Sequence, residues 1–245
     1  MWPYPKIIAH RGGGSLAPEN TLAAFECGFK HGFRAVEFDV MLTKDRIPVV
    51  VHDEELGRTI AGHGLICDTL AADLVQMDAG SWFGAEFAGC RVPRYLDVLE
   101  FCSQHGIWMN VEIKPAISFE QLTGQIVGQH TNDFYRQKSA QLPLFSSFSL
   151  EALAAAKATA THIPRGILFD QIPIDWLAHL RELDAVSLHT NQRYLTQTLT
   201  DQIKRAGYGL SCYTVNEISR AHELLDWGVD ALFTDRLTLI GPDFA

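Results

Sequence analysis

The feature that most constrains the fold of this chain is a repeated alternation of short β-type runs with amphipathic stretches of roughly 10 to 15 residues. This alternation is typical of βα units, in which a helix follows each strand of a parallel sheet. The runs that predict strands are residues 5–10, 35–41, 47–53, 108–114, 142–148, 165–170, 185–189, 209–215 and 231–235. The stretches that predict helices are residues 20–31, 94–105, 119–135, 150–159, 173–183, 194–206 and 216–227.

One connection departs from the repeat. Only residues 42–46 separate the second and third predicted strands, too few for a parallel crossover, so these strands are expected to form a hairpin. A two-residue turn at its centre would place Asp39 opposite Val50. The same register would place Glu37 opposite His52. With the returning strand set aside, eight strands remain, and 245 residues then predict an α/β fold, a closed (β/α)8 TIM barrel.

The alternation fails between residues 54 and 106, where glycines and a proline punctuate short apolar pieces. A structureless loop of that length is uncommon in a compact domain. We therefore expect an insertion at about residues 54–106, with helical turns of its own, packed over one mouth of the barrel. No tandem repeat or linker divides the sequence, so residues 1–245 are expected to form a single domain.

Charge and hydropathy limit the partners. Lysine and arginine total 20 and aspartate and glutamate total 29, which gives a formal net charge of −9 at pH 7. A field of this sign repels polyanions and disfavours nucleic acid as a partner. No apolar run approaches the ~20 residues that a membrane-spanning helix needs, so we expect no membrane insertion. The first residues lack the features of a targeting signal, which predicts a cytoplasmic location. Nothing in the sequence indicates an oligomeric state.

Polar and charged residues gather at the carboxyl ends of the predicted strands, where (β/α)8 barrels carry their reactive groups. Strands that otherwise consist of valine, isoleucine and phenylalanine have no packing reason to collect charges there. The segments concerned are His10-Arg11-Gly12, Glu37-Phe38-Asp39, His52-Asp53, Glu112-Ile113-Lys114 and Thr234-Asp235.

Three carboxylates in these segments predict a metal site. Glu37 and Asp39 are two residues apart on one strand, so their side chains project from the same face. Glu112, between two apolar residues, is expected to face inward from a neighbouring strand. Three hard oxygen donors without histidine or cysteine favour Mg²⁺ or Ca²⁺ over zinc. The alternative is that Glu37 and Asp39 lie on an edge or solvent-facing strand and bind no metal.

The remaining candidates are two histidines and two cations. His10 and His52 can titrate near neutral pH and could act as acid and base, although a strand-end histidine is often a structural residue. Arg11 and Lys114 could hold a phosphoryl group, or could only neutralise the carboxylates. The other histidines fall mostly at predicted helix ends or in loops, where solvated structural roles are expected: His31, His63, His105, His130, His162, His179, His189 and His222.

These segments occur in the order seen in a known family. Together with Pro18-Glu19-Asn20-Thr21 and Tyr213-Thr214-Val215-Asn216, the sequence resembles the glycerophosphodiester phosphodiesterase family over nearly its whole length. The pieces at residues 78–83 and 227–230 resemble the cytoplasmic bacterial members associated with glycerol 3-phosphate uptake. Tyr213 departs from the family pattern, because many members have tryptophan there.

The resemblance implies a distorted (β/α)8 barrel that uses Mg²⁺ or Ca²⁺ to hydrolyse glycerophosphodiesters, small molecules, to sn-glycerol 3-phosphate and an alcohol. The residues that match the family's metal ligands are Glu37, Asp39 and Glu112. Those that match its catalytic histidines and phosphate-side cations are His10, His52, Arg11 and Lys114. The resemblance also implies that Glu19 and Asn20 hold the first loop in shape. The nucleophile, either the glycerol 2-hydroxyl or water, stays open.

The predicted hairpin register assigns the proton transfers: His52 beside Glu37 is expected to be the base, which leaves His10 as the acid. Two other functions compete with this hypothesis. A metal-dependent lyase or isomerase would need only the carboxylates and Lys114, and it would leave both histidines unexplained. A catalytically silent barrel that binds phosphodiesters is disfavoured because every matched residue is present.

Overall fold

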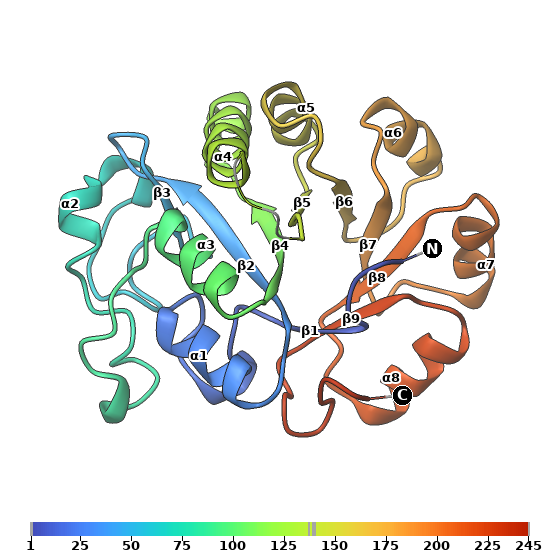
Figure 1. Cartoon of the computed structure of the whole chain (residues 1–245), viewed down its shortest axis with the longest axis horizontal. Coiled ribbons are helices and arrows are strands. Elements are labelled where there is room, and N and C mark those ends of the chain that lie inside the picture. The colour runs from blue at the N-terminus through green and yellow to red at the C-terminus, as the bar shows by residue number, and fades with distance from the viewer. Residues whose placement is uncertain (1, 137, 139–140, 245) are drawn as a thin grey trace.

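The computed structural model describes residues 2–136, 138 and 141–244. The described strands form one sheet in which eight are parallel and close on themselves, because β1 pairs with both β9 and β2 (Figure 1). The predicted (β/α)8 barrel is therefore confirmed. Its parallel strands are β1 (Ile7–Ala9), β2 (Ala35–Leu42), β4 (Trp108–Ile113), β5 (Leu144–Ser147), β6 (Arg165–Phe169), β7 (Ser187–Asn191), β8 (Gly209–Tyr213) and β9 (Ala231–Thr234).

The helices that alternate with these strands cover the outside of the barrel (Figure 1). Each of them was expected from the sequence, and their ends differ from the predicted ends by at most three residues. The helices are α1 (Leu22–Lys30), α3 (Tyr95–Gln104), α4 (Glu120–Tyr135), α5 (Leu150–Thr159), α6 (Trp176–Glu182), α7 (Gln197–Arg205) and α8 (Ile218–Asp226).

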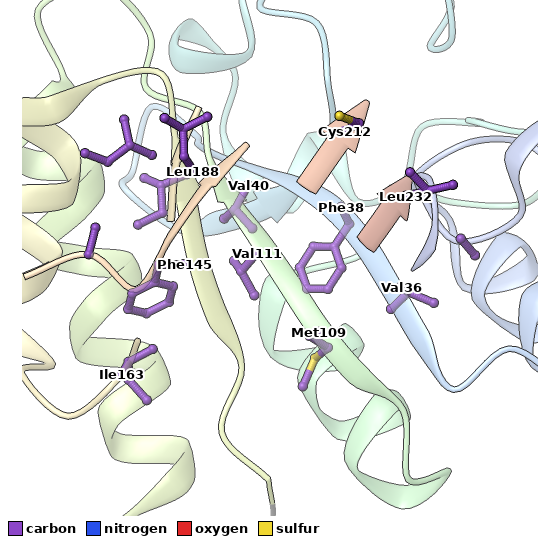
Figure 2. Close-up of a cluster of buried hydrophobic side chains, with 14 of the residues drawn as sticks. Val36, Phe38, Val40, Met109, Val111, Phe145, Ile163, Leu188, Cys212 and Leu232 are labelled. Atoms are coloured by element: carbon purple, nitrogen blue, oxygen red, sulfur yellow. The ribbon is translucent and has the colours of Figure 1, made fainter. Parts of the chain in front are cut away.

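The hydrophobic core has two parts, one outside the barrel and one inside it. Outward-facing strand residues such as Phe38, Val111 and Phe145 pack between the sheet and the helices (Figure 2). Inside the barrel, apolar residues fill its amino end, where the ring of Tyr4 stacks on Trp108 with centroids 4.3 Å apart. Because apolar side chains fill that end, the polar interior positions are concentrated toward the carboxyl ends of the strands.

The hairpin is confirmed, but its predicted register is wrong by one residue. Strand β3 (Pro48–Val50) runs antiparallel to β2, with Val40 rather than Asp39 opposite Val50. The expected pairing of Glu37 with His52 is therefore wrong as well. The ladder ends before His52, after the N–H of Val51 donates to the carbonyl of Asp39 at 3.1 Å.

The turn of the hairpin explains the difference in register. The backbone N–H of Thr43 bonds the carbonyl of Ile47 at 3.1 Å, so three residues rather than two form the loop. The third of them, Arg46, has a φ of +63°, the left-handed conformation that three-residue hairpin loops require at this position. Glycine usually marks that position, and the loop contains none. The sequence therefore gives no warning of the longer turn.

Residues 51–94 form the insertion between β3 and α3. It contains the expected short helical turns, η2 (Ile66–Asp68), α2 (Ala71–Leu74) and η3 (Ala85–Phe87). Its apolar residues Ile60, Ile66 and Leu74 build a separate small core against Met41 and Val49 of the hairpin. The insertion thus packs largely on the projecting β2–β3 hairpin at one side of the barrel, as Figure 1 shows.

Among the described residues, no helix combines the length and the apolar character that crossing a membrane demands.

Candidate active site

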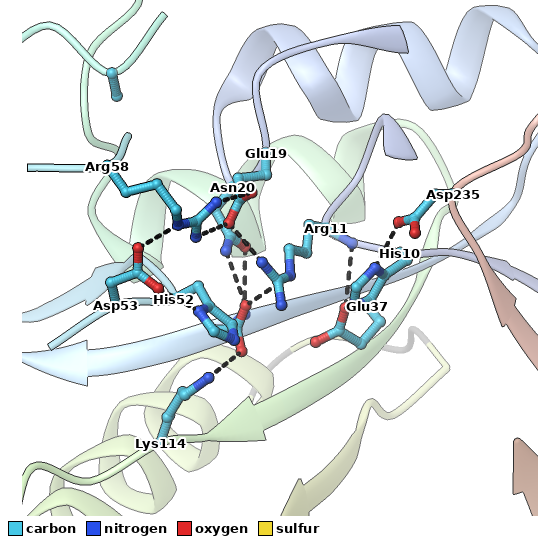
Figure 3. Close-up of polar contacts among 12 residues, drawn as sticks. His10, Arg11, Glu19, Asn20, Glu37, His52, Asp53, Arg58, Lys114 and Asp235 are labelled. Atoms are coloured by element: carbon cyan, nitrogen blue, oxygen red, sulfur yellow. Dashed lines mark hydrogen bonds and ion pairs between the residues drawn. The ribbon is translucent and has the colours of Figure 1, made fainter. Parts of the chain in front are cut away.

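A cavity of about 200 Å³ opens at the carboxyl end of the barrel, and all seven residues singled out from the sequence line it. They reach it from the middle of β2, from the ends of β1 and β4 and from the chain after β3 (Figure 3). The seven are His10, Arg11, Glu37, Asp39, His52, Glu112 and Lys114. The rest of the wall consists of Asn110, Phe148, Leu168, Tyr213, Thr214 and Phe233.

The three carboxylates meet at the floor of this cavity. Glu37 and Asp39 point into the barrel from β2 and are almost fully buried. Glu112 stands beside Asp39 in the parallel register of β4. One oxygen from each carboxylate lies within 4.8 Å of the others. The alternative of a solvent-facing strand is therefore wrong for Glu37 and Asp39.

The electrostatics of this cluster favour a bound cation. Burial and the neighbouring carboxylates raise the pKa of Glu37 well above its usual range. Burial and the charge of Asp39 likewise raise the pKa of Glu112. Burial also acts to raise the pKa of Asp39, but the charges of Lys114 and Arg11 outweigh it and lower that pKa. Two buried carboxylates and one half-buried carboxylate that repel one another fit a divalent cation such as Mg²⁺ or Ca²⁺, whose charge removes the repulsion.

The two cations stand on either side of Asp39. Lys114 places Nζ 3.5 Å from one oxygen of Asp39, and Arg11 places Nε 3.6 Å from the other. Nε of Arg11 is buried and has no hydrogen-bond partner among the described residues. The backbone N–H of Arg11 donates to Glu37 at 3.1 Å. Arg11 therefore holds its positive charge against Asp39 at the wall of the cavity.

His10 is held by an aspartate from the opposite end of the chain. Its Nδ1 lies 2.7 Å from Asp235, and its Nε2 lies 3.8 Å from Glu37. Asn216 donates to the other oxygen of Asp235 at 2.9 Å and accepts a bond from the backbone N–H of Asp235. This support fixes the ring and leaves Nε2 on the side of the carboxylates.

His52 is held in the same way by its neighbour in sequence. Its Nδ1 lies 2.6 Å from Asp53. Burial lowers the pKa of His52, and the charge of Asp39 acts against that effect. His10 is thus the histidine beside Glu37, and His52 stands in the field of Asp39. The register argument that placed His52 beside Glu37 is therefore wrong.

The structure adds supporting residues that the sequence did not place in the site. Asn20 donates to Asp39 at 2.8 Å and has a φ of +59°. It does not cap α1, because the hydroxyl of Thr21 accepts the bond from the helix start. Glu19 accepts a bond from Arg11 at 2.6 Å. The sequence could have indicated Asp53 and Asp235 by their place at strand ends, and Glu19 and Asn20 by their place in a family motif. It gave no such signal for Arg58 of the insertion, which donates to both Asp53 and Glu19.

His189 departs from the solvated role expected of the other histidines. It lies on β7 inside the barrel and is completely buried. Burial lowers its pKa to about 3, so the ring is neutral at ordinary pH. Its Nε2 lies 3.0 Å from the hydroxyl of Ser187. The solvated structural role expected of this residue was therefore wrong.

Comparison with known proteins now bears on this site. The sequence model of the glycerophosphoryl diester phosphodiesterase family matches residues 10–239. The chain belongs to this family. The match begins at the first histidine of the cavity and runs through nearly the whole barrel. The enzyme class predicted from the sequence, a phosphodiesterase and hence a hydrolase, is confirmed.

Individual members of the family are similar to the chain over most of their length. A glycerophosphodiester phosphodiesterase of Caldanaerobacter subterraneus subsp. tengcongensis is 32% identical over 230 residues, which cover 94% of this chain and 93% of that protein. One of Bacillus subtilis is 30% identical over 243 residues, which cover 93% and 82%. A solved phosphodiesterase structure from Oleispira antarctica, in complex with the product sn-glycerol 3-phosphate, is 40% identical with a TM-score of 0.90 and covers 95% and 93%.

Proposed function

We propose that this chain hydrolyses glycerophosphodiesters to sn-glycerol 3-phosphate and an alcohol, with a divalent cation and two histidines. The observation that carries the proposal is the meeting of a buried carboxylate triad, two cations and two aspartate-held histidines in one cavity of a chain of this family. The Oleispira antarctica structure, which holds sn-glycerol 3-phosphate, supports this class of product.

Glu37, Asp39 and Glu112 would hold the cation, Mg²⁺ or Ca²⁺. When bound, it supplies Lewis-acid stabilisation of the charge that develops on the phosphoryl oxygens. Of the chain's own groups, Arg11 and Lys114 line the same cavity as positive charges beside Asp39. Both act as fixed donors to the non-bridging oxygens as the phosphorus becomes five-coordinate.

The two histidines move the protons. One accepts the proton of the attacking hydroxyl as its oxygen bonds to phosphorus, and the other donates a proton to the departing alcohol oxygen as its bond to phosphorus breaks. Because burial favours the neutral form of His52, this ring suits the role of base, and His10 then acts as the acid. Attack by water gives both products in one step. Attack by the glycerol 2-hydroxyl releases the alcohol and leaves a cyclic phosphate, which water opens in a second step with the roles of the two histidines exchanged. Both routes end in the same products.

A lyase or isomerase remains the weaker hypothesis, because it gives no role to the two aspartate-held histidines that face the triad.

We further propose that residues 1–245 act as a single domain on small-molecule substrates in the cytoplasm. The family match over residues 10–239 supports the single domain, and the net charge of −9 supports small molecules rather than nucleic acid as ligands.

An assay of product identity tests this function. The purified protein is incubated with Mg²⁺ or Ca²⁺ and with glycerophosphocholine or glycerophosphoethanolamine. Glycerol 3-phosphate is then measured with a coupled dehydrogenase. We expect release from both diesters, and none from a Glu112→Gln variant that lacks one proposed ligand. Absence of release from every diester, or release of a phosphorylated alcohol instead of glycerol 3-phosphate, would contradict the proposal.

A further inference from the structure

We propose that Arg58, which the insertion carries, is a positioning residue for the reaction: it orients His52 through Asp53 and Arg11 through Glu19. The inference rests on the proposed function for its kinetic consequence, while its structural consequence can be measured separately. Figure 3 shows the Arg58 guanidinium between the carboxylates of Asp53 and Glu19.

The contacts form a continuous chain between the two cavity residues. Nε of Arg58 donates to Asp53 at 2.5 Å, and the other oxygen of Asp53 lies 2.6 Å from Nδ1 of His52. Both terminal nitrogens of Arg58 donate to Glu19, at 2.7 and 2.8 Å. One oxygen of Glu19 also accepts the bond from Arg11 at 2.6 Å. Arg58 therefore links Asp53, which follows β3, to Glu19, which lies between β1 and α1.

The chemistry of the contact requires arginine. A planar guanidinium can bind one carboxylate with two donors and a second with its Nε–H, which a lysine ammonium cannot reproduce. Burial acts to raise the pKa of Asp53, but the hydrogen bonds from Arg58 and His52 outweigh it and lower this pKa to about 2. Without Arg58, Asp53 and Glu19 would lose the cation that they share, and each would be held only by its cavity residue, Asp53 by His52 and Glu19 by Arg11.

The insertion in turn fixes Arg58. Two backbone bonds close the loop around it, from Gly57 to Ile60 at 2.8 Å and from Leu56 to Gly64 at 2.9 Å. Ile60 is buried in the small core that packs on the hairpin. The side chain of Arg58 itself is 46% exposed, so its removal opens no cavity in that core. The position of this loop thus determines where Arg58 holds Asp53 and Glu19, and through them His52 and Arg11.

Only one of the two cavity histidines is linked to Arg58 among the described residues: His52 through Asp53, whereas Asp235 holds His10. His10 can therefore serve as the control for His52. Asp235, which holds His10, is supported by Asn216 and makes no hydrogen bond with the insertion among the described residues. Removal of Arg58 should therefore disturb His52 and leave His10 as it is. A general loss of structure would disturb both rings.

Kinetics of three variants test the inference: Arg58→Ala, Arg58→Lys and the control Arg91→Ala. Arg91 is also an exposed insertion arginine, but its side chain bonds Gln76 rather than the cavity network. We expect Arg58→Ala to lower kcat roughly 10- to 100-fold, as losses of supporting hydrogen bonds do, with a smaller change in KM. Arg58→Lys should recover little. Added guanidinium ion should restore part of the rate of Arg58→Ala, and Arg91→Ala should match the wild type.

The second measurement uses ring ¹⁵N shifts of the histidines in the metal-free protein, so it does not depend on turnover. In the wild type, Nδ1 of neutral His52 should carry the proton, because it faces the Asp53 carboxylate. Arg58→Ala should shift His52 toward a mixture of tautomers while the shifts of His10 stay unchanged.

Unaltered kcat and unaltered His52 shifts in Arg58→Ala would overturn the inference, as would equal changes at His10 and His52. A wild-type protein that releases no glycerol 3-phosphate would instead contradict the proposed function. In that case, the His52 and His10 shifts alone would decide whether Arg58 positions His52.

Discussion

Each histidine of the cavity is fixed at Nδ1 by its own aspartate, His10 by Asp235 and His52 by Asp53. In the proposed mechanism both rings therefore offer Nε2 for proton transfer, and their different surroundings would divide the roles of acid and base. His10 stands next to Glu37, whereas His52 stands in the field of Asp39, and burial lowers the pKa of His52.

Leaving-group chemistry tests this division. A general acid matters most when the departing alkoxide is a strong base, such as that of choline, and little when it is an acidic phenol. We expect His10→Ala and His52→Ala each to lose about 10²-fold or more in kcat/KM on glycerophosphocholine. On a p-nitrophenyl diester, His10→Ala should recover much of its deficit and His52→Ala should not. Equal deficits of both variants on both substrates would contradict a division between acid and base.

At this scale the sequence could predict the residues that line the cavity, because strand-end charges and a family motif mark them. It could not predict Arg58 or the pairing of Glu19 with two arginines. These contacts join segments that only the folded chain brings together. It also misplaced His189, whose predicted strand ended at that residue, although the strand continues to Asn191 and carries the ring inside the barrel.

Among the elements, the β2–β3 hairpin is where prediction and structure differ most. The existence of the hairpin followed from a connection too short for a crossover. Its register depended on the number of loop residues, and Arg46 occupies a left-handed position that sequence patterns normally assign to glycine or asparagine. A shift of one residue in the register places the side chains of a strand on the opposite face of the sheet. The predicted pairing of Glu37 with His52 was therefore wrong as well.

Substitution of Arg46 by glycine tests this conformation. A left-handed φ costs a residue with a side chain about 1–2 kcal/mol, and glycine removes this cost. Glycine also makes the unfolded chain more disordered, which lowers the free energy of unfolding by roughly 0.5–1 kcal/mol. Arg46→Gly should therefore raise the free energy of unfolding by about 0.5–1 kcal/mol in urea titrations. Activity should not change.

Lys44→Gly is the matched control, since Lys44 is an exposed residue of the same loop without a positive φ. It should lower the free energy of unfolding, because glycine adds only disorder to the unfolded chain there. If both substitutions destabilised the protein equally, the three-residue turn described above would be wrong.

For the whole molecule, the barrel concentrates buried negative charge at one end of a chain that already carries a net charge of −9. A cation bound only by the folded state should stabilise it by mass action, by about 2.7 kcal/mol at 100 times Kd. For a protein of this size, that corresponds to a rise in Tm of roughly 5–10 °C.

Thermal unfolding of the chelator-treated protein with and without added Mg²⁺ or Ca²⁺ measures this effect. The wild type should show the rise in Tm, and Glu112→Gln should show little or none. An equal rise in both proteins would indicate a cation site elsewhere. The same stabilisation should weaken as the pH falls, because protons compete for Glu37 and Glu112, whose pKa values are raised.

The barrel itself was the most predictable feature of the molecule. Its eight strands and the helices between them follow from periodicity repeated along the chain, so a local error such as the hairpin register does not alter the architecture. The insertion was predictable as an interruption with short helical turns, but the surface on which it packs was not. Its packing on the hairpin depends on a small core of scattered residues such as Ile60 and Leu74, which show no period in the sequence.

The central claim is that hydrolysis needs a divalent cation at the triad of Glu37, Asp39 and Glu112. The most direct measurement is glycerol 3-phosphate release from glycerophosphocholine by protein freed of metal with a chelator, followed by addition of Mg²⁺ or Ca²⁺. We predict that release stops after chelation and returns as the cation is added. Undiminished release by the metal-free protein would contradict the claim.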